Sequence, residues 1–379
     1  MAWGKRWTWR AKILLALGLG MGGYLGLGLL FFGFRLPPLQ WEPSSRATQM
    51  ESPDGTFFVE GSGATFVRSE GNTLVFRAST PTPMLIVSSK ATTTAHVVLQ
   101  NIHPDALPGP VAPEHTEGLT RFYELTIEPG LGLLIQPRLD VEKAEFRFAA
   151  IGDTGGGVEL DHALQRAEEL GADFVLHLGD LEYQEGDMER AAVALNAANI
   201  PTFACIGNHD FHDGLDKVHR RFTELIGPRN SFFDLGGVRF LNLDTAADTW
   251  PSNGGDRGAL MKLLLASEFP QDSELVVFTH RPLNDPRAGV GEDGHAIGHS
   301  AEVEWLRESF LELGADALLH GHIHETHSDM VDGMSAYIIG NGLNLPESGP
   351  AVEAGILIGE WNSQAPQVSY RIEPLYPTG

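Results

Sequence analysis

Apolar and polar residues alternate in two different ways along this chain, and the pattern changes near residue 144. Between residues 41 and 140, short alternating runs recur between Pro, Gly, Asn and Asp residues. Such runs are typical of β-strands, because successive side chains of a strand point to opposite faces. The runs are TLVFRAS, PMLIVSS, AHVVLQNI, RFYELTI and GLLIQPR. We therefore predict a small antiparallel, sandwich-like β domain over residues 41–140.

From residue 145 onward, apolar strand-like runs alternate with amphipathic helical segments. The segment VELDHALQRAEEL repeats its apolar residues at helical spacing, and similar segments follow later strand-like runs. SFFDLGGVRFLNLDT predicts a hairpin that turns at Gly236 and Gly237. The last two runs, AGILIGEWN and QVSYRIEPL, have no helix between them. Residues 144–376 are thus expected to form an α/β domain with some antiparallel strands.

The N-terminal segment has the pattern of a membrane anchor. Residues 13–34 contain no charge, and as a helix they would span about 33 Å, close to the thickness of a bilayer core. A cleaved signal peptide is less consistent, because its apolar region is shorter and no A-x-A site follows. Four basic residues precede the span: Lys5, Arg6, Arg10 and Lys12. They place the N-terminus in the cytoplasm, so residues 1–36 are predicted to be an uncleaved anchor.

This topology predicts that the rest of the chain is extracytoplasmic, either periplasmic or at the cell surface. Three glycines within the span have the spacing of paired helices: Gly18, Gly22 and Gly26. Because glycine is common in membrane helices, a homodimer stays an open alternative.

The composition excludes one large class of partner. The chain of 379 residues carries 26 Lys and Arg against 50 Asp and Glu, a formal net charge of -24. A body this acidic repels phosphate backbones, so we do not expect nucleic-acid binding. Its single cysteine, Cys205, excludes an internal disulfide.

Five strand-like runs end on residues that commonly bind metals, in the segments GDTG, GDLEY, GNHD, FTH and HGHIH. Each could have an ordinary role as a turn, a helix cap or a packed histidine. Five such coincidences in one chain are much less probable than a common site. Ligands of open α/β sheets gather at the carboxyl ends of strands. We therefore expect six residues to meet there: Asp153, Asp180, Asn208, His280, His322 and His324.

These blocks, in this order over residues 146–342, resemble the calcineurin-like metallophosphoesterases. The resemblance implies a two-sheet sandwich flanked by helices and a pair of metal ions. In one respect the sequence departs from the commoner branch, which has D-x-H in the first block, because Gly155 stands where that histidine would be. Tyr183, three residues after Asp180, offers a substitute ligand, and this combination is similar to the purple acid phosphatases. The alternative is that Tyr183 caps its strand without binding metal.

By this resemblance, two metal ions share Asp180. The first would be bound by Asp153, Asp180, Tyr183 and His324, and the second by Asp180, Asn208, His280 and His322. Hard oxygen ligands such as a phenolate suit Fe(III), and the second metal would be Fe, Zn or Mn. His320 and His327 are expected to pack or face solvent, and His177 to lie in the core.

The resemblance also suggests roles in catalysis, with a metal-activated hydroxide attacking the phosphorus. His209, oriented by Asp210, would protonate the leaving group, and its alternative role is structural. His295 and His299 are candidates for contacting the phosphate, although they come late in their loop. Arg281 and Arg287 are alternatives for that contact.

The predicted function is hydrolysis of small-molecule phosphate monoesters by a membrane-anchored phosphatase. A phosphodiesterase acting on cyclic nucleotides or on lipid and envelope phosphoesters is an alternative, because the same bimetal core serves both. A protein phosphatase also stays open. In a different class, the β domain would bind a partner and the phosphatase body would be inert, but the complete set of ligand motifs argues against this.

Overall fold

The computed structural model describes residues 48–139, 145–210, 220–246, 255–267, 273–287, 296–343 and 353–377. These residues belong to one compact unit. The predicted span at residues 13–34 and the candidate His295 lie outside the described residues. Within the described part of the chain, no helix combines the length and apolar character that a membrane crossing requires.

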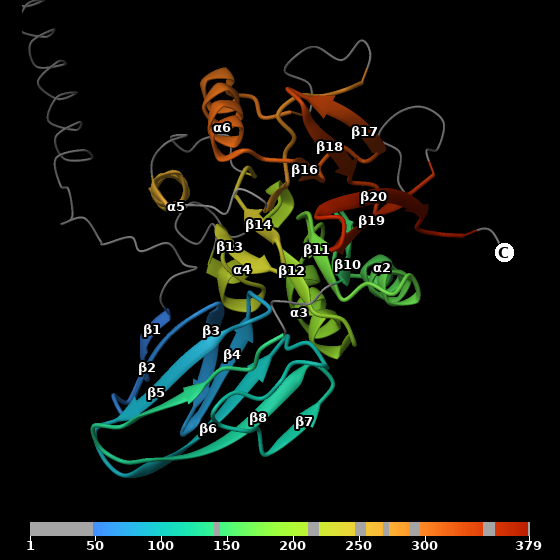
Figure 1. Ribbon diagram of the computed structural model, residues 1–379. Helices are drawn as coiled ribbons and strands as arrows, with labels where there is room; N and C mark the ends of the chain where they lie inside the picture. The colour runs from blue at the N-terminus through green and yellow to red at the C-terminus, as the bar shows by residue number, and fades with distance from the viewer. Residues whose placement is uncertain are drawn as a thin grey trace, which may run out of the picture. The chain divides into compact units, whose positions relative to one another are not determined.

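The N-terminal strands form two sheets, which we call the N-terminal sandwich (residues 48–139; Figure 1). The first sheet has the order β1 (Thr48–Glu51), β2 (Phe57–Ser62), β5 (Met84–Ser89) and β9 (Gly132–Ile135). The second has the order β3 (Ala64–Glu70), β4 (Thr73–Ala78), β6 (Thr93–Gln100), β8 (Thr120–Ile127) and β7 (His115–Glu117). Side chains from both sheets share one core, with Val59 and Val87 from the first and Phe76 and Val97 from the second.

One pairing in this sandwich differs from the prediction of an antiparallel domain. Strands β4 and β6 are parallel neighbours, with Phe76 opposite Leu99. The strand between them in the chain, β5, belongs to the other sheet and reverses the direction there. The alternating pattern cannot reveal this, because it reports which faces are buried but not which strands pair.

The C-terminal sandwich (residues 145–377) also has two sheets, as predicted for this part of the chain. The five-stranded sheet has the order β12 (Thr202–Ala204), β11 (Phe174–His177), β10 (Glu145–Ile151), β19 (Gly355–Asn362) and β20 (Gln367–Pro374). The six-stranded sheet has the order β13 (Ser231–Leu235), β14 (Val238–Asn242), β15 (Glu274–Thr279), β16 (Ala317–His320), β18 (Met334–Ile339) and β17 (Thr326–Val331). Strands β10, β11 and β12 are parallel, and so are β14, β15, β16 and β18.

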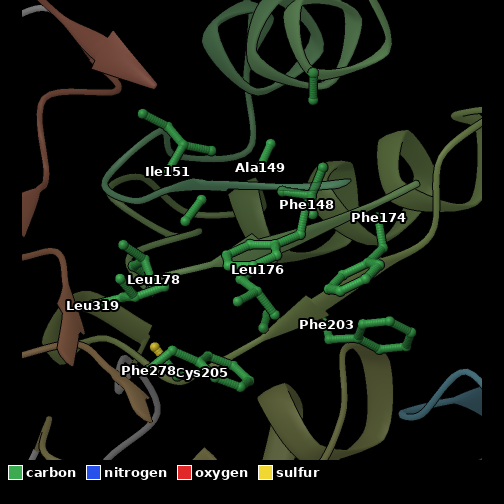
Figure 2. Close-up of a cluster of buried hydrophobic side chains, with 14 of the residues drawn as sticks. Phe148, Ala149, Ile151, Phe174, Leu176, Leu178, Phe203, Cys205, Phe278 and Leu319 are labelled. Atoms are coloured by element: carbon green, nitrogen blue, oxygen red, sulfur yellow. The ribbon is translucent and has the colours of Figure 1, made fainter. Parts of the chain in front are cut away.

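Aromatic side chains fill the space between these two sheets. The ring of Phe240 packs edge-on against Phe148 and Phe174, with ring centroids 5.2 and 5.4 Å apart. Figure 2 shows this part of the core, where Phe148 and Phe174 lie close to Leu176 and Phe203. Burial of rings of this size is the main stabilising contribution of such a core.

Helices cover the outer faces of the C-terminal sandwich. They are α2 (Val158–Glu169), α3 (Asp187–Ala197), α5 (Gly255–Ala266) and α6 (Ser300–Leu313), while the short α4 (Arg220–Leu225) lies against α3 and against strand β3 of the N-terminal sandwich. The buried residues of α2 are those whose spacing predicted the helix, among them Leu160 and Leu164. Helices α5 and α6 bury Leu260 and Phe310 against the other face of the six-stranded sheet. The predicted hairpin is confirmed, with Leu235 opposite Val238.

Candidate metal centre

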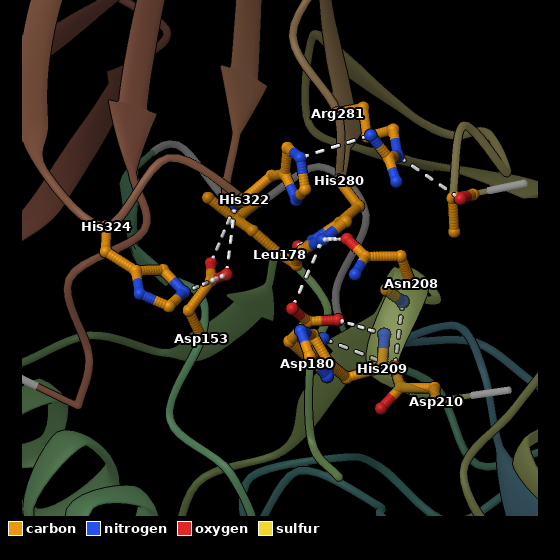
Figure 3. Close-up of polar contacts among 12 residues, drawn as sticks. Asp153, Leu178, Asp180, Asn208, His209, Asp210, His280, Arg281, His322 and His324 are labelled. Carbon is orange, nitrogen blue, oxygen red and sulfur yellow. Dashed lines mark hydrogen bonds and ion pairs between the residues drawn. The ribbon is translucent and has the colours of Figure 1, made fainter. Parts of the chain in front are cut away.

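The polar residues predicted from the strand ends meet in one place. Asp153 follows β10, Asp180 follows β11, Asn208 follows β12, and His280 comes directly after β15. Because these strands run parallel within their sheets, their carboxyl ends bring the following loops to the same edge. Figure 3 shows these side chains converging, with His322 and His324 approaching from the loop after β16.

Left-handed backbone conformations shape this edge. Among the described residues only five non-glycine residues have positive φ, and three belong to the site: Asp153 (59°), Asp180 (60°) and His322 (69°). Such conformations are unfavourable for residues with a Cβ, and they concentrate at functional sites. Because φ of His322 is left-handed, residues 322–324 do not form an extended segment.

Instead, the backbone turns at His322 and binds Asp153. The backbone N–H of His322 donates to both carboxylate oxygens of Asp153, at 2.9 and 3.1 Å. A side chain at Gly321 would obstruct this approach, since a Cβ there would lie 2.5 Å from Oδ2 of Asp153. Similarly, a Cβ at Gly207 would lie 2.1 Å from Oδ1 of Asp180. Glycine is therefore required at both positions for the backbone to pass so close to the carboxylates.

On one side of the site, Asp180, His280 and His322 each present a ligand atom, and these atoms lie within 4.8 Å of one another. Nδ1 of His280 donates to the carbonyl oxygen of Leu178 at 2.8 Å. Its Nε2 therefore faces two oxygens, Asn208 Oδ1 at 2.9 Å and Asp180 Oδ2 at 3.4 Å. Two oxygens around one imidazole nitrogen need a positive charge between them, supplied by a proton or a metal ion.

The pKa shifts of His280 and Asp180 agree with the need for a positive charge. Burial alone would lower the pKa of His280, but the charge and hydrogen bond of Asp180 outweigh burial and raise it to about 9. Burial would raise the pKa of Asp180, but the positive charge of His280 holds it well below its usual range. The neighbouring Asp153 has its pKa raised to about 6, mainly by burial. The site is therefore a buried group of acids that is stabilised by a cation.

On the other side, the phenol oxygen of Tyr183 lies among three proposed ligand atoms. It is 3.1 Å from Nε2 of His324, 3.2 Å from Oδ2 of Asp180 and 3.4 Å from Oδ1 of Asp153. Nε2 of His324 is itself 3.5 Å from Oδ1 of Asp153. Burial and the two carboxylates raise the pKa of Tyr183 well above its ordinary value. A phenolate would therefore form here only with a cation beside it.

The two groups of donor atoms share Asp180 and differ in chemistry. One group offers carboxylate and phenol oxygens with a single imidazole, and the other offers two imidazoles, an amide and the shared carboxylate. The residues therefore fit a pair of metal ions with the ligand sets that the sequence implied.

Asp210, proposed from the sequence to orient His209, has a set of backbone contacts within the site. Its carboxylate accepts four backbone N–H groups, from Asp180 (3.2 Å), Leu181 (2.8 Å), Glu182 (3.0 Å) and Gly207 (2.7 Å). Burial and the nearby Asp180 raise the pKa of Asp210 to about 8. Asp210 thus joins the loops after β11 and β12.

His209 is held at the site in a different way. Its backbone N–H donates to Oδ1 of Asp180 at 2.9 Å. Its ring packs against the ring of Tyr183, with centroids 4.5 Å apart. His209 is therefore positioned by two of the proposed ligands, which places its imidazole beside the donor atoms.

Asp187, at the start of α3, supports the Tyr183 loop and was not identified from the sequence. Its Oδ2 accepts the backbone N–H groups of Tyr183 (3.0 Å) and Gln184 (2.7 Å). The available signal was an acidic residue in the first turn of a predicted helix, where carboxylates commonly accept backbone N–H groups.

The other histidines near the site have structural contacts. His177 is fully buried and hydrogen-bonded to Thr154 at 2.9 Å. His320 is buried with its Nδ1 2.8 Å from Oγ1 of Thr279. Nε2 of His327 lies 2.6 Å from a carboxylate oxygen of Glu325. These contacts agree with the expectation that His177 lies in the core and that His320 and His327 pack or face solvent. His299 lies directly before α6.

The two arginines considered for phosphate contact differ in position. Nη1 of Arg281 lies 3.2 Å from Nε2 of His322, at the edge of the site. Arg287 instead forms two hydrogen bonds with Asp285, at 2.7 and 2.9 Å. Arg281 is therefore the arginine that contacts a proposed ligand.

The part of the chain that carries the site matches a known protein family. The family model of the calcineurin-like phosphoesterases matches residues 146–326. Similar solved structures include a purple acid phosphatase from yellow lupin (Lupinus luteus) seeds, with 15% identity and a TM-score of 0.48 over 84% of this chain and 79% of that chain. A dimetal phosphatase from Danio rerio has 13% identity and a TM-score of 0.43 over 61% of this chain and 96% of that chain.

GAP50, described as the anchor in the inner membrane complex of Plasmodium, has 15% identity and a TM-score of 0.40 over 62% of this chain and 90% of that chain. The comparison with curated proteins gave no match. Two metal ions held close together are a common means of hydrolysing phosphoric esters. The family model thus covers the part of the chain that carries the proposed ligands from Asp153 to His324, and it identifies the protein as a phosphoric ester hydrolase.

Proposed function

We propose that this protein is a membrane-anchored, extracytoplasmic phosphomonoesterase of the purple acid phosphatase type. Its substrate would be a small-molecule phosphate monoester. Fe(III) would lie beside Tyr183, and Fe, Zn or Mn would occupy the second position. The sequence supports the branch through Gly155, which stands where the commoner branch has a ligand histidine.

The observation that carries the branch assignment is the position of the Tyr183 phenol oxygen. It lies within 3.4 Å of Asp153, Asp180 and His324, the three residues proposed to share its metal. A tyrosine that only capped its strand would have no reason to bring its hydroxyl to two buried carboxylates, which raise its pKa. Ligation by the phenolate relieves this unfavourable arrangement.

When bound, two such metal ions polarise the phosphoryl group and provide a hydroxide at moderate pH. The chain itself supplies orientation and proton transfer. His209 lies beside Tyr183 and is fixed through its backbone to Asp180, so its imidazole is the proposed donor of a proton to the leaving alkoxide. Asp210 keeps the two loops of the site together through its four backbone contacts.

The membrane topology rests on sequence alone. The uncharged residues 13–34 follow Lys5, Arg6, Arg10 and Lys12, which favours a cytoplasmic N-terminus. Added protease would degrade the body of the protein in intact cells or spheroplasts if the topology is right. Protection of the body until the membrane is disrupted would contradict it.

Activity and metal content test the enzymatic proposal. We expect the purified full-length protein in detergent to hydrolyse p-nitrophenyl phosphate faster than bis-p-nitrophenyl phosphate. Metal analysis should find iron, and the visible spectrum should contain a broad tyrosinate-to-iron charge-transfer band. A faster diester reaction would instead indicate a phosphodiesterase. Full loading with Mn or Zn and no such band would assign the protein to the general branch.

A further inference from the structure

Arg281 lies at the edge of the metal site, directly after the proposed ligand His280. Its Nη1 donates to Nε2 of His322 at 3.2 Å, and its Nε donates to the carbonyl oxygen of Ala246 at 3.3 Å. Figure 3 shows its side chain beside His322, on the side of the site where His280 and Asn208 lie. The guanidinium is thus next to the group formed by Asp180, His280 and His322.

The backbone of Arg281 is fixed by a buried hydroxyl. Oγ1 of Thr245 accepts the backbone N–H of Arg281 at 2.8 Å, and the same hydroxyl lies 3.3 Å from its carbonyl oxygen. Thr245 is 2% exposed and follows the end of β14. With its backbone held by Thr245 and its Nε held by the carbonyl oxygen of Ala246, Arg281 is positioned as a group that recognises a substrate should be.

The chemistry of a guanidinium at this position matches a phosphate oxygen. Arginine keeps its charge at all relevant pH values and presents several N–H groups in one plane, which suits phosphate. A monoester phosphate is a dianion at neutral pH, whereas a diester phosphate is a monoanion. A fixed positive charge beside the second metal position therefore stabilises the bound monoester more than the bound diester.

We propose that Arg281 binds a non-bridging oxygen of the substrate phosphate and thereby makes the site selective for monoesters over diesters. This inference rests on the proposed function, because it concerns the substrate preference of the same site. Arg281 exchanges its contact with the His322 ring for the phosphate oxygen when the substrate enters. No covalent step involves Arg281, and its part is to bind and orient.

Kinetics with two substrates test this role. For Arg281→Gln we expect kcat/KM for p-nitrophenyl phosphate to fall about tenfold to hundredfold, as for the loss of a charge-assisted hydrogen bond. The value for bis-p-nitrophenyl phosphate should fall much less, and Arg281→Lys should recover part of the monoester activity. Thr245→Val should shift the preference in the same direction but less. Arg307→Gln, on α6 and paired with Asp332, is the matched control.

A second measurement separates binding from structure. Inorganic phosphate, titrated calorimetrically into the metal-loaded protein, should bind about tenfold more weakly to Arg281→Gln. The metal content and thermal midpoint should match the wild type. The proposal would be overturned if kcat/KM fell equally on both substrates. It would also be overturned if the phosphate affinity of Arg281→Gln were unchanged or if this variant lost the second metal. If the wild type hydrolyses neither substrate, the proposed function fails, but the phosphate titration still tests Arg281.

Discussion

The phenol oxygen of Tyr183 lies 3.1 Å from Nε2 of His324, although 141 residues separate the two in the sequence. Tyr183 comes from the loop before α3 in one half of the C-terminal sandwich, and His324 comes from the loop after β16 in the other. Asp153 and Asp180 complete the surroundings of this oxygen. This contact joins the two sheets at their shared edge, and we expect it to be made through a metal ion in the active protein.

Replacing Tyr183 by Phe removes the proposed phenolate ligand with little change in volume. We expect the visible charge-transfer band to disappear and kcat to fall by at least about tenfold, because the remaining ligands hold the trivalent ion less well. Absorption spectra and metal analysis of the purified variant measure both effects. Tyr370→Phe, in the same sandwich but away from the site, should keep the band. A band that survives in Tyr183→Phe would contradict ligation by Tyr183.

Substitution of His209 tests its role as a proton donor. We expect His209→Ala to slow hydrolysis of glycerol phosphate by about 10²–10⁴-fold, since an alkoxide leaves poorly without a proton. Hydrolysis of p-nitrophenyl phosphate should slow much less, because nitrophenolate leaves readily without one. Steady-state rates on the two substrates provide the comparison. Equal losses on both would indicate that His209 only supports the site through its contact with Tyr183.

The candidate site could be predicted from the sequence because its residues directly follow strands. An apolar run that ends in Gly-Asp or Gly-Asn-His indicates both a strand and the position at which the following loop begins. The loop after β16 shows the limit of this reasoning, since the left-handed φ of His322 depends on its backbone contact with Asp153. The four backbone contacts of Asp210 could not be predicted for the same reason, because the partners come from two loops that meet only in the folded protein.

Parts of the fold were hidden by weak or misleading patterns. Helix α5 contains Gly258 and three consecutive leucines, which obscure the helical period. Strand β17 lies at the edge of its sheet with mostly half-buried and exposed residues, so it has no apolar alternation. The parallel pairing of β4 with β6 depends on which sheet β5 joins, which is decided by tertiary packing.

Glu274, at the start of β15, makes the stability depend on pH at the opposite end of this strand from the proposed ligand His280. Burial and the neighbouring Asp316 raise the pKa of Glu274 to about 7. The folded protein therefore binds this proton more tightly than the unfolded chain does. The stability that this proton provides is complete below about pH 4.5 and is lost as the pH rises through 7.

We therefore expect Glu274→Gln, which stays neutral, to gain thermal stability relative to the wild type as the pH rises from 5 to 8. Thermal midpoints measured at several pH values give this difference directly. Glu312→Gln, at an exposed position of α6, should show no such trend. If the difference in thermal midpoint between Glu274→Gln and the wild type is constant or decreases with pH, ionisation of Glu274 does not destabilise the folded protein.

Arg77 connects the N-terminal sandwich to the C-terminal sandwich, and its burial predicts a large effect on stability. Arg77 is 1% exposed, its Nε donates to the carbonyl oxygen of Ile226 at 3.1 Å, and its Nη1 donates to Oδ1 of Asn196. Arg77→Ala removes both hydrogen bonds and leaves a cavity, so we expect the free energy of unfolding to fall by about 3 kcal/mol or more. Denaturant unfolding of the full-length protein in detergent measures this change. Arg68→Ala, which loses only an exposed ion pair with Glu70, should cost less than about 1 kcal/mol. Equal costs for the two variants would mean that the buried contacts of Arg77 add little to the stability of the folded protein.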